Sequence, residues 1–333
     1  MLHNSVKHIF VLCIGLGCSL FCSQTRAQTP DTLIRKLDSL RKSGDTAKQI
    51  NNTEKWAFTD RTNLNGSSYF MLLGSNLKQS FTKPFHMKPK DWANLGKFVL
   101  LEVALSFVDE PIQRNALDWR NSSNTVQDVN NYITRFGGLY EVYTLAGLAA
   151  TGYLTKNNKL TTTTLLASQS YLTAGAVQLV LKALTGRQRP SYTDRYTLDA
   201  EPRFHGPFYK SVDINGYKTN SSFPSGHTTG VFAAATVYSL EYKDKKLVPF
   251  ISYGIATAIG LSRIVENKHW LTDVVAGAAL GYITGQQVVN NYHRYARIKN
   301  DEAAAKSKKK GSVVFNLDYS NGVLQPGFVY TFR

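Results

Sequence analysis

His269 and Asp273 have the types and spacing of a catalytic imidazole and its acidic partner. Residues four apart share a face of a helix, so the Asp273 carboxylate is expected to accept the Nδ1–H of His269. That contact would leave Nε2 free to attack an electrophile or to take a proton. An exposed pair at the start of a helix would have the same spacing, so this pair does not establish catalysis by itself.

The segment Phe223-Pro224-Ser225-Gly226-His227 precedes an apolar, helix-compatible run that ends at Leu240. Ser225 is predicted to cap that helix, and the N–H groups around it would then form a positive helix end that suits an anion. Gly226 has no Cβ to keep an oxyanion away from the backbone. An ordinary helix cap with a chance histidine would explain the same residues.

Two further groups add positive charge. Lys182 lies near the end of a long apolar helix candidate that Gly186 can terminate, and Arg189-Pro190 follows in an extended segment. A positive helix C-terminus that complements the helix dipole is the alternative interpretation of these cations. The dipeptide Ser262-Arg263 stands shortly before His269.

Taken together, the groups contain three cations, a helix N-terminus, an oriented histidine and a second histidine. This is the set needed for phosphoryl transfer without a metal ion, because charge develops on the equatorial oxygens while the attacking and leaving groups lie in line. We therefore predict phosphoryl-transfer chemistry.

The three groups also resemble the signature motifs of a known family. Lys182-x6-Arg189-Pro190, Pro224-Ser225-Gly226-His227 and Ser262-Arg263-x5-His269-x3-Asp273 are similar to the motifs of the type 2 phosphatidic acid phosphatases, which share a site with the vanadium haloperoxidases. The resemblance covers residues 91–290 approximately, and both ends of the chain lie outside it.

This resemblance implies a role for each residue. His269 would attack phosphorus and carry the phosphoryl group, Asp273 would orient it, and His227 would protonate the leaving oxygen and then activate water. It assigns phosphate binding to Lys182, Arg189, Ser225, Gly226 and Arg263. It also implies that neither a metal nor another cofactor is needed.

The elements that must position these residues are predicted to be helices. Apolar segments rich in Ala, Gly and Leu indicate six of them, at 92–108, 138–155, 161–184, 228–243, 247–262 and 271–291. Six helices with short connections predict an all-α fold, a compact helical bundle over residues 91–300.

The two ends of the chain are expected to differ from the bundle. Residues 1–27 are typical of a signal peptide, and 28–90 are predicted to be irregular with one short helix at 31–43. The charged run 301–311 is predicted to be a linker. Alternating residues around Asn321-Gly322 then predict a short C-terminal β-hairpin over 312–333, which must dock on something to be stable.

Charge and cysteine usage restrict the environment and the partners. The 39 Lys and Arg residues against 23 Asp and Glu give a net charge of +16, and all three cysteines fall within the first 22 residues. Removal of the predicted signal peptide would leave a protein without cysteines. We expect this protein to be exported to the periplasm or cell envelope. Export makes nucleic acid an unexpected partner, whereas an anionic lipid surface or a phosphorylated substrate fits the charge. The sequence does not define an oligomeric state.

Three functions remain open at this stage. We favour a membrane-associated phosphatase acting on lipid phosphates or polyprenyl diphosphates. The alternatives are a soluble acid phosphatase of broad specificity, which accepts small phosphate esters, and a vanadium-dependent haloperoxidase, which would hold vanadate in the same anion site.

Overall fold

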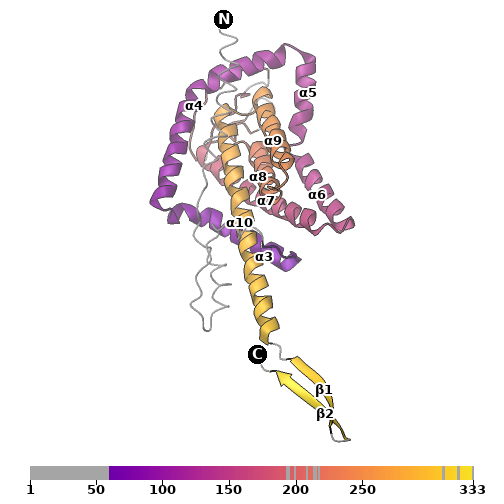
Figure 1. Ribbon diagram of the computed structural model, residues 1–333. Helices are drawn as coiled ribbons and strands as arrows, with labels where there is room; N and C mark the ends of the chain where they lie inside the picture. Colours follow the sequence, from indigo (N-terminus) through magenta and orange to yellow (C-terminus); the bar gives the residue numbers. More distant parts are fainter. Residues whose placement is uncertain are drawn as a thin grey trace. The chain divides into compact units, whose positions relative to one another are not determined.

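The computed structural model describes residues 60–192, 196–198, 200–207, 209–212, 216, 218–309, 312–320 and 323–331. The described chain is mainly α-helical, which confirms the all-α prediction for the bundle (Figure 1). The expected signal peptide at 1–27 and the short helix at 31–43 lie outside the described residues, so export stays a prediction.

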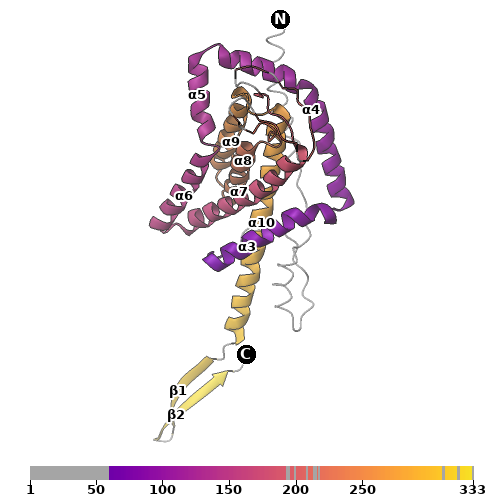
Figure 2. The ribbon, with the colours of Figure 1, turned by 180° about the vertical axis from the view of Figure 1, so that it is seen from behind.

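Eight α-helices and one short 3-10 helix occur in the described residues. They are α3 (Gly66–Thr82), η2 (Lys83–His86), α4 (Pro89–Asn121), α5 (Asn124–Arg135), α6 (Leu139–Leu154), α7 (Asn158–Thr185), α8 (Gly226–Glu241), α9 (Leu247–Val265) and α10 (Leu271–Lys309). Figures 1 and 2 show α7, α8, α9 and the first part of α10 clustered together, while α4 and α5 lie at the periphery.

Helix α3 occupies a region that was predicted to be irregular, so that prediction is wrong for residues 66–82. The Asn65 side chain accepts from the Ser68 N–H at 2.8 Å, and Ser68 reciprocates at the Asn65 N–H. The buried face of α3 is largely polar, and its Asn76 Nδ2 donates to Gln169 Oε1 on α7 at 3.1 Å. Hydrophobic periodicity cannot detect a helix that is held by buried amide hydrogen bonds.

Three other helical regions differ from the prediction. The expected linker 301–311 is helical as far as Lys309, because its Ala, Glu and Lys residues are strong helix formers. Helix α4 extends to Asn121 instead of 108, and α5 was not predicted. In α5 the buried Asn130 Nδ2 donates to the Ser262 carbonyl oxygen at 3.2 Å, so a polar contact again anchors the helix.

A close approach of α10 to the start of α8 positions the candidate site. Gly277 makes it possible, since a Cβ there would lie 2.7 Å from the Ser225 carbonyl oxygen. The Ser225 N–H in turn donates to the Asp273 carbonyl oxygen at 2.9 Å. The first turns of these two helices are therefore tied together.

The surface carries exposed apolar side chains. Six on α4 are between 41% and 80% exposed and fall on one side of the helix: Trp92, Leu95, Val99, Leu100, Val103 and Phe107. In the described part of the chain, one helix, α9, is long and apolar enough to cross a membrane by length and composition. Patches of this kind mark contacts with a partner or a lipid phase.

The C-terminal region belongs to a second unit of the chain. Asn63–Asn290 forms one compact unit, and the residues from Asn291 onward belong to the other. In that second unit, β1 (Ser312–Ser320) pairs antiparallel with β2 (Val323–Thr331), with Ser312 opposite Thr331. The docking expected of this hairpin stays a prediction.

Candidate active site

His269 and Asp273 lie at the beginning of α10. His269 stands two residues before the first helical residue, Leu271, and is not itself on the helix as the spacing predicted. Its Nδ1 lies 3.6 Å from Asp273 Oδ2, which is longer than a hydrogen bond. Asp273 Oδ2 already accepts from Ser222 Oγ at 2.5 Å and from the Trp270 N–H at 2.8 Å, so the carboxylate is shared.

Burial and nearby charges set the protonation states of this pair. Burial lowers the pKa of His269 well below its ordinary value. The positive charges of Arg189 and Lys182 also lower this pKa, whereas Asp273 raises it. Burial would raise the pKa of Asp273, but Arg187, His269 and Ser222 lower it to about 2. At neutral pH the site therefore presents a neutral imidazole beside a carboxylate, as a nucleophile requires.

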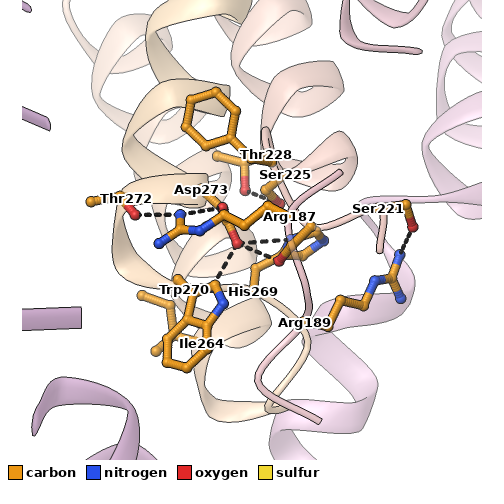
Figure 3. A network of polar contacts seen from close by, with 12 residues as sticks. Arg187, Arg189, Ser221, Ser225, Thr228, Ile264, His269, Trp270, Thr272 and Asp273 are labelled. Carbon is orange, nitrogen blue, oxygen red and sulfur yellow. Dashed lines mark hydrogen bonds and ion pairs between the residues drawn. The ribbon is translucent and has the colours of Figure 1, made fainter. Parts of the chain in front are cut away.

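Arg187 is a functional candidate that the sequence analysis missed. Its NH1 donates to Asp273 Oδ1 at 2.6 Å, and its NH2 donates to Asp109 Oδ2 on α4 at the same distance. All three side chains are fully buried. Figure 3 shows the guanidinium beside Thr272 and Asp273, and its NH1 also donates to Thr272 Oγ1 at 2.6 Å.

Two of the cations predicted to bind phosphate, Lys182 and Arg189, lie in the last turn of α7 and just after its end. Gly186 ends this helix with a φ of 55°, in the left-handed region that favours glycine. Burial lowers the pKa of Lys182, in the last turn, to about 7, and the charges of Arg189 and Arg263 contribute. Arg189 NH2 donates to Ser221 Oγ at 3.3 Å (Figure 3).

Arg263 reaches the site from the end of α9. Its NH1 donates to Thr134 Oγ1, at the end of α5, at 2.5 Å. The Arg263 carbonyl oxygen accepts from the N–H groups of Lys268 and His269 at 3.1 and 3.3 Å. One residue therefore supplies a guanidinium and also fixes the backbone that carries His269.

His227 lies in the first turn of α8, where the sequence predicted it. Ser225 is the N-cap residue, but its side chain does not cap the helix and instead accepts from Thr228 Oγ1 at 2.9 Å. A Cβ on Gly226 would lie 3.2 Å from Gln178 Nε2, so glycine permits that close contact. Gly138, before α6, packs against the imidazole, since a Cβ there would lie 3.1 Å from His227 Nε2.

Electrostatic interactions connect the two histidines with the predicted cations. Burial, together with the charges of Arg263, Lys182 and Arg189, lowers the pKa of His227 to about 3. Two of these cations also lower the pKa of His269. Lys182 and Arg189 therefore act on both histidines, and Arg263 acts on His227. In the described part of the chain, no group of three or more His, Cys, Asp or Glu side chains is placed to hold a metal ion.

Four residues that the sequence analysis did not identify lie around the carboxylate of Asp273. Asp109, Arg187, Ser222 and Thr272 contact Asp273 directly or through one another. The signal available for Asp109 was a charged residue in an apolar helical region. For Arg187 it was an additional cation between Lys182 and Arg189.

Comparisons with known proteins show what this helical region is similar to. The model of the PAP2 superfamily matches residues 163–297. The matched segment contains all eight site residues predicted from the sequence.

Individual relatives match shorter regions. A lipid A 1-phosphatase of Porphyromonas gingivalis is 46% identical over 69 residues, 20% of this chain and 15% of that protein. The "Probable lipid phosphate phosphatase 4" of Arabidopsis thaliana is 33% identical over 129 residues, 34% of this chain and 42% of that protein. The chain thus spans less than half the length of these two relatives.

A solved structure is also similar. It is a transmembrane PAP2-type phosphatidylglycerolphosphate phosphatase from Bacillus subtilis, with a TM-score of 0.40 and 20% sequence identity. The match covers 63% of this chain and 94% of that chain.

Proposed function

We propose that the protein is a phosphatase that hydrolyses lipid phosphates or polyprenyl diphosphates through a phospho-histidine at His269. The observation that carries this proposal is the common environment of the two histidines, which share the positive charges of Lys182 and Arg189. Such an environment binds a phosphoryl group and stabilises the charge on its oxygens during transfer.

The reaction needs two steps in this site. In the first, His269 Nε2 forms a bond to phosphorus, the bond from phosphorus to the leaving oxygen breaks, and His227 donates a proton to that oxygen. In the second, water attacks phosphorus, its proton passes to His227, and the N–P bond breaks to release phosphate. A bound phosphate dianion favours the protonated form of His227 by offsetting the surrounding cations that lower its pKa.

A lipid substrate is supported by the surface and by the relatives. The exposed apolar side chains on α4 and the apolar helix α9 offer contacts to a lipid phase, and the net charge of +16 suits an anionic one. The two curated relatives described above carry lipid phosphatase names. We propose that the protein is exported and works at a membrane surface in the cell envelope.

Release of inorganic phosphate from a panel of substrates tests this function. The panel contains purified lipid phosphates, polyprenyl diphosphates and water-soluble phosphate esters, and the full chain is assayed in detergent. Faster release from the lipids supports the proposal. Equal rates on small esters would favour a soluble phosphatase of broad specificity, and no release from any of them would refute a phosphatase.

Phosphate release is expected to be unaffected by a chelator. Nitrogen nucleophile, proton donor and oxyanion-binding cations all come from side chains in this mechanism, so no step depends on a metal ion. The measurement compares initial rates before and after dialysis against EDTA. Loss of activity that a divalent cation restores would contradict the expectation.

Activity is expected to fall above a pH of about 7 because of Lys182. Burial and neighbouring cations lower its pKa to about 7, so its ammonium is charged below this pH and neutral above it. The pH dependence of kcat/KM reports the pKa values of groups in the free enzyme, so we expect kcat/KM to decrease above about pH 7. A bound phosphate raises the pKa of Lys182, so the same decrease in kcat should occur at higher pH.

The Lys182→Arg variant separates this effect from other titrations. Its guanidinium stays charged, so the decrease in kcat/KM near pH 7 should be removed. Lys218→Arg is the matched control, since Lys218 is an exposed cation whose charge contributes to the lowered pKa of Lys182. An unchanged pH profile in Lys182→Arg would exclude Lys182 as the titrating group.

A further inference from the structure

Three charged side chains form a buried cluster behind His269. Arg187 contacts Asp273 with one nitrogen and Asp109 with the other, each at 2.6 Å, and none of the three is exposed to solvent. Thr272 joins the same cluster, because its Oγ1 donates to Asp109 Oδ2 at 2.6 Å and its N–H donates to Oδ1 at 3.0 Å. Asp109 therefore accepts three hydrogen bonds.

We infer that Asp109 is a positioning residue that shares the Arg187 guanidinium with Asp273 and so leaves the acidic partner of His269 with uncompensated negative charge. The inference rests on the proposed function, because it concerns the charge that His269 acquires during phosphoryl transfer. It also extends the site to α4, which lies outside the matched segment 163–297.

The charge balance of the cluster supports this role. Two carboxylates and one guanidinium give a net charge of −1 in a region from which solvent is excluded. Burial and the charge of Asp273 raise the pKa of Asp109 above its ordinary value, and the charge of Arg187 and the two hydrogen bonds from Thr272 limit this rise and favour the ionised form. Without Asp109, Arg187 would neutralise Asp273, and the cluster would carry no net charge.

Glu102, one more carboxyl group near the cluster, does not change this balance at neutral pH. Burial and the negative charges of Asp109 and Asp273 raise the pKa of Glu102 to about 8. It is therefore protonated at pH 7. The negative charge that remains thus belongs to the two aspartates.

The net charge matters when His269 attacks. Its imidazole then gains positive charge, which is costly in a buried place unless a negative group lies nearby. A cluster with a charge of −1 stabilises this charge, whereas a neutral Arg187–Asp273 pair would not. Loss of Asp109 should therefore slow the chemical step without weakening phosphate binding, which we assign to Lys182, Arg189 and Arg263.

Asp109→Asn tests the inference in the full-length protein with p-nitrophenyl phosphate. We expect kcat to fall about 10- to 100-fold, as is usual for groups that orient a catalytic residue from behind, with KM unchanged. Inorganic phosphate should inhibit the variant at the same concentration as the wild type. Glu110→Gln removes the neighbouring carboxylate, which forms an exposed pair with Arg114, and should leave kcat unchanged.

A double-mutant cycle with Asp273→Asn separates positioning from a general structural effect. If Asp109 acts through Asp273, Asp109→Asn should lower kcat only slightly in the Asp273→Asn background. An equal loss in both backgrounds would overturn the inference, as would a kcat in Asp109→Asn equal to that of Glu110→Gln. Asp109→Glu keeps the charge and should recover part of the rate.

Thr272→Val is the second variant, should Asp109→Asn not fold. It removes the hydroxyl that contacts both Arg187 and Asp109 while keeping both carboxylates. Because this hydroxyl is one of the groups that favour ionised Asp109, its loss should protonate part of Asp109 and lower kcat with KM unchanged. A wild-type kcat would overturn the inference. Wild-type protein that releases no phosphate would defeat the proposed function instead, so the two failures are distinguishable.

Discussion

Replacing His269 by alanine is expected to abolish phosphate release. The variant lacks the nitrogen that forms the bond to phosphorus, and loss of a nucleophile costs about 10⁴-fold or more in kcat. The cations around the site are unchanged, so inorganic phosphate should still bind to the folded variant. Initial rates with a soluble aryl phosphate and thermal unfolding with and without phosphate measure the two effects.

His205→Ala is the matched control for this experiment. His205 is exposed and its ring stacks on Tyr209 with ring centroids 4.1 Å apart, in the segment between α7 and α8. We expect wild-type turnover in this variant. A His269→Ala protein that keeps wild-type turnover would contradict the proposed nucleophile, whereas loss of both turnover and phosphate binding would show that the substitution disturbs the fold.

Replacing His227 by glutamine is expected to lower kcat for alkyl phosphates by about 10²- to 10⁴-fold, the contribution of a general acid and base. With an aryl phosphate, whose leaving oxygen needs no proton, the first step should remain fast. Hydrolysis of the phospho-histidine would still lack a base, so the intermediate should accumulate. A burst of phenol release followed by slow turnover would record this.

The trapped intermediate gives a direct test of both roles. Protein labelled with radioactive phosphate should keep its label in base and lose it in acid, because the N–P bond is acid-labile. The label should be absent from the double variant His227→Gln, His269→Ala. A label that survives acid, or one retained without His269, would assign the nucleophile to a different side chain.

Several features of the site were predictable because they depend on local chain geometry. The helix that begins at Gly226 and the left-handed end of α7 at Gly186 follow from residue type and position. The apolar helices α6 to α9 follow from hydrophobic patterning. Their existence was predicted correctly, although α5 and the full lengths of α4 and α10 were not, since buried polar contacts and helix-forming charged residues leave no apolar pattern.

The sequence by itself determined the candidate residues for holding and attacking a phosphoryl group, because motif spacing along the chain records their types and their places at helix ends. Only the tertiary structure decided how those residues interact. It placed Asp273 Oδ2 3.6 Å from His269 Nδ1 and brought Asp109 from α4 to the far side of Arg187. Contacts between helices distant in sequence, and the burial that shifts the pKa of Lys182 and of both histidines, arise only when the helices pack.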